Sequence, residues 1–160
     1  MNPSSYQLNF TIPQGPTGPN FGLNAYGGRY HNTGGNISLG IGTPSQIPLS
    51  LTMPNQNTTY VATNSITVTE AGVYEINYSS TLSVALGTTL TLAVRSNGTN
   101  IPTTVISKAL SVGTGSLYSG SVITNLTAGS VIDMAISALI AVGVTLGSGV
   151  NSILTVKRIN

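Results

Sequence analysis

The sequence predicts an all-β fold, an antiparallel β-sandwich of jelly-roll type with about ten strands. Three observations predict it: apolar and polar residues alternate with period two, turn signals recur at short intervals, and no segment has a convincing helical periodicity. The chain has 160 residues and 40% hydrophobic content, which is enough for one domain with a sizeable core. We expect the jelly-roll domain to span residues 23–160, after a Pro/Gly-rich arm at residues 1–22.

The strand that organises the rest runs from Val73 to Leu86. Its even-numbered residues are apolar or aromatic except for Ser80, and its odd-numbered residues are mainly polar. This alternation is typical of a strand with one buried face, whereas a helix would have no contiguous apolar face. Tyr74 and Tyr78 share the predicted buried face, so we favour a core position for them over a sugar-stacking platform.

Four strands are expected before this central one. Ala25–His31 carries aromatic residues and ends at a Gly-rich turn, and Ile37–Ile41 follows with regular alternation. Ile47–Met53 alternates too, and its prolines favour a position at the edge of a sheet. Tyr60–Val68 then leads into the central strand.

Further strands are expected after it. Thr89–Arg95 is followed by Asn97-Gly98, the strongest hairpin signal in the chain, so Ile101–Leu110 is predicted to be the return strand. Leu117–Leu126 follows a glycine-rich loop, and Val150–Ile159 ends the chain.

The run from Ile132 to Leu146 is apolar at every even position and also carries apolar residues at odd ones. Helical spacing is tolerated here, but the unbroken even set favours a strand. Burial on both faces is expected for a central strand or at an oligomer interface. Because few charges keep the surface solvated, we expect this run to line a subunit interface. The candidate interface residues are Ile132, Met134, Ile136, Ile140 and Val142.

Residues 15–20, with the sequence GPTGPN, form two Gly-X-Y triplets with proline at the X position (Gly15, Pro16, Gly18 and Pro19). The period of three does not continue on either side, and two triplets cannot hold a collagen triple helix. Two interpretations stay open. The segment is either a Pro/Gly linker or the remnant of a collagen-like stalk.

The charge content is unusually low. Charged residues make up 5% of the chain, five basic and three acidic, against about 25% in an ordinary domain. They are spread along the sequence, so no basic patch for nucleic acid or anionic membranes is expected.

The longest apolar run, Val131–Val142, contains Asp133 and is too short to span a bilayer, so we expect no membrane insertion. No cysteine is present, which excludes disulfides and thiolate metal sites.

Residues for catalysis are scarce. The single histidine, His31, would need a nucleophile and an orienting acid brought to it by the fold. Glu75 and Asp133 are a formal pair for glycoside hydrolysis, which requires two facing carboxylates. The sequence has neither an acidic cation-binding loop nor a glycine-rich phosphate loop. We therefore expect no enzyme, with no catalytic residue, metal or cofactor.

Several segments, taken in order, point to a known family. They are GPTGPN, AYGGRYHNTGGNISLGIG, ITVTEAGVYEINYSSTLSVALGTTLTLAVRSNG and, at the end, ILTVKRIN. With the triplets, the most telling piece is Glu70–Tyr74. Together these segments resemble the C-terminal domain of BclA-type collagen-like glycoproteins of the bacterial exosporium, over roughly residues 23–160.

The resemblance implies a jelly roll of the tumour-necrosis-factor and complement-head kind, assembled as a homotrimer. Its implied function is the structural head of a collagen-like fibre on the spore surface, in an exosporium filament or at an appendage tip. It implies O-linked sugar on Thr17 and anchoring to spore-coat, exosporium or appendage proteins through residues 1–14. The alternative function is an adhesin or lectin-like head that contacts host or environmental ligands.

Overall fold

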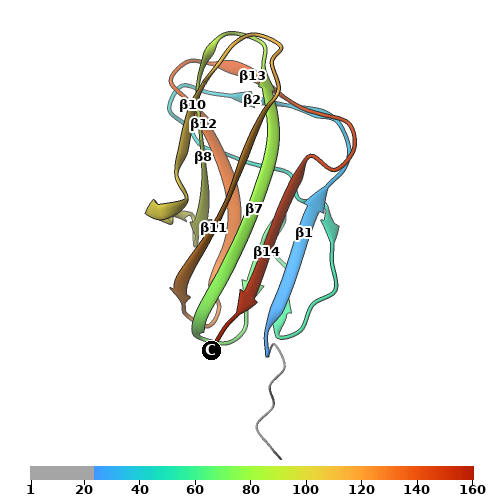
Figure 1. The fold of residues 1–160 in the computed structure, drawn as a ribbon, viewed down its shortest axis with the longest axis vertical. Helices are drawn as coiled ribbons and strands as arrows, with labels where there is room; N and C mark the ends of the chain where they lie inside the picture. Colours follow the sequence, from blue (N-terminus) through green and yellow to red (C-terminus); the bar gives the residue numbers. More distant parts are fainter. Residues whose placement is uncertain (1–23) are drawn as a thin grey trace, which may run out of the picture.

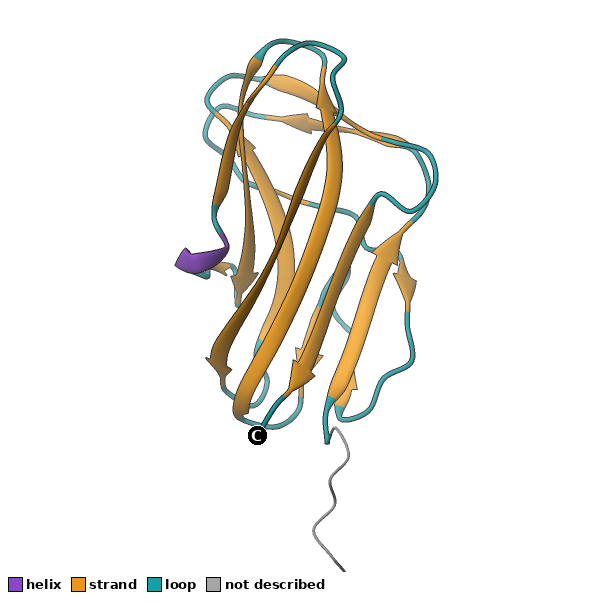
Figure 2. Ribbon diagram, viewed as in Figure 1, coloured by secondary structure: helices purple, strands orange, loops and turns teal. Residues whose placement is uncertain are grey.

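The computed structural model describes residues 24–160, and it confirms the predicted all-β sandwich (Figures 1 and 2). Two antiparallel sheets of seven strands each face one another across a single core, and the described residues contain one short 3-10 helix besides the strands. Nine of the strands have five residues or more, close to the predicted ten, and the other five are two or three residues long.

The first sheet, sheet A, is built around β7, which pairs with β11 along one edge. Along its other edge β7 pairs first with β14 and then, nearer its end, with β13. The far side of β14 pairs with β1, and the far side of β13 pairs with β2. Figure 1 shows β11, β7, β14 and β1 side by side. The strands of sheet A are β1 (Tyr26–His31), β2 (Gly35–Leu39), β4 (Leu51–Thr52), β7 (Gly72–Val84), β11 (Ser116–Leu126), β13 (Val142–Leu146) and β14 (Ser152–Arg158).

The second sheet, sheet B, has β8 and β12 at its centre. β10 and β9 pair with β8, while β6 and β3 pair with successive parts of β12. The strands of sheet B are β3 (Ser45–Gln46), β5 (Thr58–Thr59), β6 (Ile66–Val68), β8 (Thr88–Ser96), β9 (Thr99–Asn100), β10 (Ile106–Leu110) and β12 (Val131–Ala138), with the 3-10 helix η1 at Pro102–Thr104.

The prediction for the central strand is confirmed. From Tyr74 to Val84 the even-numbered residues of β7 are buried, and every odd-numbered residue is half-buried or exposed. Because successive side chains of a strand point to opposite faces, the even set faces sheet B and the odd set forms the outer face of sheet A.

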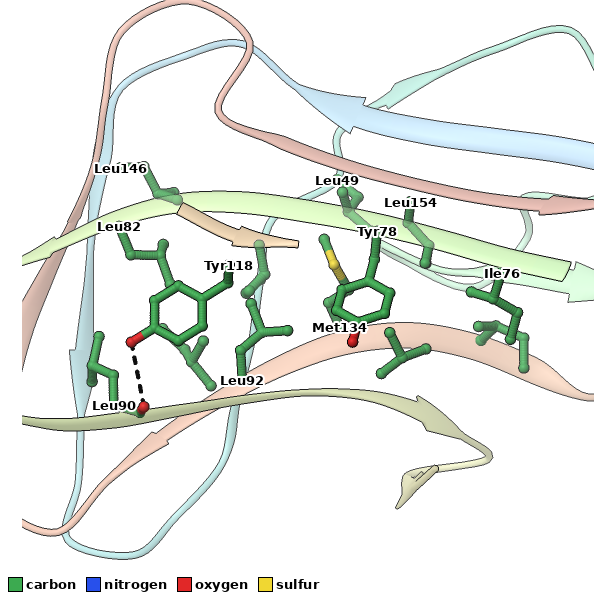
Figure 3. Packing of buried hydrophobic residues seen from close by; sticks show 14 of the residues in the cluster. Leu49, Ile76, Tyr78, Leu82, Leu90, Leu92, Tyr118, Met134, Leu146 and Leu154 are labelled. Carbon is green, nitrogen blue, oxygen red and sulfur yellow. Dashed lines mark hydrogen bonds between the residues drawn. The ribbon is translucent and has the colours of Figure 1, made fainter. Parts of the chain in front are cut away.

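Three tyrosines lie in the core, as expected for Tyr74 and Tyr78, and each hydroxyl has a partner. Tyr118 donates to the carbonyl of Leu90 at 3.3 Å (Figure 3). Tyr78 donates to the Thr104 carbonyl at 3.0 Å, and Tyr74 donates to a backbone carbonyl at 2.8 Å. Buried phenols are tolerated because none of these hydroxyls is left without a hydrogen bond.

The hairpin prediction is confirmed, but its return strand is shorter than predicted. Asn97 and Gly98 connect β8 to β9 with φ angles of 51° and 78°, as a two-residue hairpin turn of type I′ requires. The expected strand from Ile101 is interrupted by η1, because Pro102 cannot donate to a ladder, and β10 begins at Ile106.

The prediction of one long strand from Ile132 to Leu146 is wrong. The chain turns at 139–141 and crosses from β12 in sheet B to β13 in sheet A. The apolar faces of both strands therefore point into the same core. Among the candidate interface residues, Ile132, Met134 and Ile136 have no exposed area and Val142 is 6% exposed, whereas Ile140, at the turn, is 42% exposed.

This burial removes the reason for assigning those four residues to a subunit interface, because their own subunit covers them. The Ile47–Met53 strand is corrected in the same way. Ile47 and Leu49 lie in the core, but here the chain crosses from β3 to β4 without forming one continuous strand.

The predictions for the arm lie outside the described residues. They concern the triplet residues Gly15, Pro16, Gly18 and Pro19, the glycosylation of Thr17 and the anchoring segment 1–14. The boundary between residues 22 and 23 stays a prediction.

Candidate association surface on sheet A

The outer face of sheet A carries a hollow where β1, β14 and β7 lie side by side. Its volume is about 430 Å³. The lining residues are Tyr26, Gly27, Gly28, Met53, Pro54, Asn77, Thr155, Val156 and Lys157. Most of the lining is apolar, so the hollow fits an apolar side chain better than a charged group.

The hollow depends on Gly28, because the Met53 side chain lies against the position that a Cβ atom would occupy there. A Cβ atom on Gly28 would lie 2.6 Å from Met53 Sδ and 3.0 Å from Thr155 Cγ2. The Met53 amide also donates to the Gly28 carbonyl at 2.8 Å, which holds the segment after β4 against β1. A larger residue at position 28 would displace the methionine from the sheet.

Strand register aligns the polar residues of this face in rows. Tyr26 pairs with Lys157, which pairs with Glu75. Lys157 Nζ lies 2.6 Å from Glu75 Oε2, and Ser121 donates to the other carboxylate oxygen at 3.5 Å. The hydrogen bond from Lys157 lowers the pKa of the Glu75 carboxyl. The face therefore has no net charge along this row.

Two aliphatic side chains project from the same outer face on β11, an edge strand. Leu117 is 53% exposed and Ile123 is 64% exposed. Between them on this face lie Ser119 and Ser121. The face thus has an apolar hollow on one side and projecting aliphatic groups on the other. Such a surface suits a heterologous contact, in which one copy's projections meet the next copy's hollow.

The residues considered for catalysis are not brought together. His31 Nδ1 lies 2.9 Å from the hydroxyl of Ser50 at an exposed position. Glu75 belongs to sheet A and Asp133 to sheet B, each on an outer face, so these carboxylates point away from each other. Within residues 24–160 no three His, Cys, Asp or Glu side chains gather as a metal site requires.

The buried carboxylate of Asp133 has a structural environment. Arg95 binds it with two nitrogens, each at 2.7 Å, and Gln46 Nε2 donates to it at 2.9 Å. The carboxylate belongs to β12, and its two partners belong to β8 and β3, the strands that pair with β12. These contacts therefore link three neighbouring strands of sheet B. The bidentate contact also raises the pKa of Arg95.

Sequence reasoning missed the hollow because its parts are far apart in the chain. Gly28 and Met53 meet only through the pairing of β1 with the segment around β4. The available signal was the pair Gly27-Gly28 inside an aromatic strand, since glycine in a strand often marks a close approach by another segment.

Comparison with solved structures shows the fold. Matches include Eiger TNF from S. frugiperda, 12% identical with a TM-score of 0.53, covering 85% of this chain and 91% of that one. Murine APRIL at pH 5.0 is 11% identical with a TM-score of 0.57, covering 84% and 98%. The globular domain of zebrafish complement 1qA is 13% identical with a TM-score of 0.53, covering 85% and 98%. The chain therefore has the jelly-roll fold of tumour-necrosis-factor and complement-head domains.

The sequence gives the more specific family. Residues 28–160 match the family described as the BclA C-terminal domain, and the chain belongs to this family. The resemblance found in the sequence is thereby confirmed. A comparison with curated proteins gave no match. None of the helices in residues 24–160 is long and apolar enough to cross a bilayer.

Proposed function

We propose that this chain is the non-catalytic, trimeric head of a collagen-like fibre on the surface of bacterial spores. The observation that carries the proposal is the match to the BclA C-terminal domain over residues 28–160, which begins a few residues after two Gly-Pro-X triplets at 15–20. A head of this kind holds three chains together where a stalk begins.

The trimer contact is assigned to the outer face of sheet A. Leu117 and Ile123 of one subunit would pack over the hollow beside Gly28 of the next subunit. A heterologous contact of this kind closes a ring of three when each copy is rotated by one third of a turn relative to the last. The core residues of β12 take no part, because their own subunit buries them.

The test of assembly is the mass of the full chain in solution, measured by light scattering, together with Ile123→Arg. The native chain is expected to be a trimer and the variant a monomer, because an arginine in an apolar contact loses its hydration without gaining a partner. Val61→Arg is the matched control, since Val61 is 91% exposed and lies outside this surface, and it should stay trimeric. A monomeric native chain, or a trimeric Ile123→Arg, would contradict the assignment.

The test of location is antibody labelling of intact spores and of spores stripped of their outermost layer. Label on intact spores that disappears with that layer is expected. Label confined to the spore interior would reject a surface role while leaving the trimer untouched.

A further inference from the structure

Four loops at one end of the sandwich form an uncharged surface with projecting aliphatic side chains, here named the apolar tip. The loops are residues 40–43, 85–87, 111–115 and 139–141. The exposed side chains are Ile41 (73%), Leu86 (56%), Val112 (63%), Leu139 (75%) and Ile140 (42%).

Backbone hydrogen bonds hold these loops together. The Gly42 amide donates to the Ala138 carbonyl at 3.0 Å, and the Gly113 amide donates to the Val84 carbonyl at 3.1 Å. Ala85 likewise donates to a carbonyl at the start of β13, at 3.0 Å. Gly42 and Gly113 have φ angles of 65° and 71°, so each loop turns tightly. The aliphatic side chains are therefore held outward by ordered turns.

The tip lies at the end of the molecule opposite to the point where the chain enters the described fold. In Figure 1 these loops are at the upper end, while β1 begins, and the C-terminus lies, at the lower end. It also shares no residue with the lining of the hollow or with Leu117 and Ile123. A contact at the tip is thus compatible with the proposed trimer.

The chemistry of the tip is narrow. Its loops consist of Gly, Ala, Ser, Thr, Val, Leu and Ile alone, with no charged or aromatic residue. Strong protein contacts centre on Trp, Tyr and Arg anchors, and Leu, Val, Ser and Thr are under-represented among them. Anionic lipids attract Lys and Arg, and none is present in these loops. Separate aliphatic side chains on small loops fit an uncharged, deformable apolar surface better than they fit a rigid pocket on a protein partner.

We propose that the apolar tip binds a lipid–water interface without net charge, such as the surface of a zwitterionic phospholipid bilayer. Its aliphatic side chains reach the boundary between headgroups and acyl chains while the fold stays on the membrane surface and spans nothing, and the loop hydroxyls stay among the headgroups. Three copies in one head would present three tips, so weak contacts of single tips add to a stronger attachment.

The test is co-flotation of the full chain with phosphatidylcholine vesicles, with and without phosphatidylserine, at about 0.05 M and about 0.5 M salt. Binding should be equal for both vesicles and at both salt concentrations. Ile41→Ser combined with Leu139→Ser should lower the partition coefficient about tenfold, because the two most exposed aliphatic side chains of the tip are lost. Val61→Ser removes an aliphatic side chain that is more exposed than either of these but lies outside the tip, and this variant should bind like the native chain.

A labelled variant gives a second readout. The chain has no cysteine, so Ser111→Cys places one environment-sensitive dye at the tip and Thr63→Cys places one elsewhere on an exposed loop. Phosphatidylcholine vesicles should shift the emission of the first dye to the blue and leave the second unchanged.

Four outcomes would overturn the proposal: no binding, binding that needs phosphatidylserine, binding abolished by salt, or undiminished binding of the double serine variant. A doubling of the native mass that the double variant abolishes would show instead that the tip binds a second copy. Since none of these readouts depends on spores, failure here leaves the proposed function standing.

Discussion

Individual glycines decide how the core side chains reach their partners. Tyr78 passes over Gly120 of the neighbouring strand to donate to the Thr104 carbonyl. The hydroxyl of Thr104 in turn accepts a hydrogen bond from the Val94 amide at 3.0 Å. Sheet A is thereby joined to η1 and to sheet B across the open edge of the sandwich.

We predict that Gly120→Ala destabilises the protein by about 2 to 4 kcal/mol, through overpacking and a weakened hydrogen bond. The new Cβ would lie 2.5 Å from the Tyr78 hydroxyl and 2.7 Å from Cζ, so the ring must move. The measurement is urea unfolding. Gly35→Ala is the control, because Gly35 has no atom within 4 Å of its Cβ position, and it should change stability by less than about 0.5 kcal/mol. Equal effects of the two substitutions would refute this account.

At the scale of the strands, the Arg95–Asp133 pair holds β8 and β12 in register on the outer face of sheet B. Both side chains are largely buried, with 17% and 10% exposed. Gln46 of β3 completes the hydrogen bonding of the carboxylate. Removal of one partner leaves the other charge poorly hydrated, which costs more than the pair itself contributes.

We therefore predict that Arg95→Met destabilises the protein by about 2 kcal/mol, and that Arg95→Met combined with Asp133→Leu is more stable than this single variant. Denaturant unfolding of the native chain, both single variants and the double variant gives the coupling energy. Additive effects of the two substitutions would show that the residues do not act as a pair.

Strand periodicity could be predicted from the sequence wherever one strand has one buried face, as in β7. The alternation does not show which sheet a strand joins. The apolar alternation from Ile132 to Leu146 has no break, so the sequence did not reveal that the chain passes from one sheet to the other at 139–141. The same limit applies to Ile41 and Ile140, which continue the apolar alternation of their runs yet project from loops. The hollow beside Gly28 depends on pairing between distant strands and has no local pattern.

Over the whole molecule, the few charges are almost all neutralised by partners. Three ion pairs use six of the eight charged residues and include every acidic one. The other two cations lie over tyrosine rings: Arg29 is 5.3 Å from the ring centre of Tyr60, and Lys108 is 5.0 Å from that of Tyr118. Hydroxyls and amides provide most of the remaining polar surface, so salt has little to screen.

This distribution predicts a stability that is nearly independent of pH from about 5 to 9 and falls above about pH 10. Burial raises the pKa of Tyr118 to about 12, and it also raises the pKa of Tyr74 and of Tyr78. A phenol with a raised pKa keeps its proton in the folded state, while the unfolded chain loses it near pH 10, so alkali favours unfolding. For Tyr118 the loss approaches about 2 kcal/mol near pH 12. The lowered pKa of Glu75 affects stability only in acid, because the stabilisation from its charged form is lost as pH falls below the usual carboxyl range.

Thermal unfolding followed by circular dichroism across this pH range is the measurement. Tyr118→Phe keeps the buried ring and should show a smaller alkaline loss than the native chain, and an identical loss in both would mean that this phenol does not control the transition.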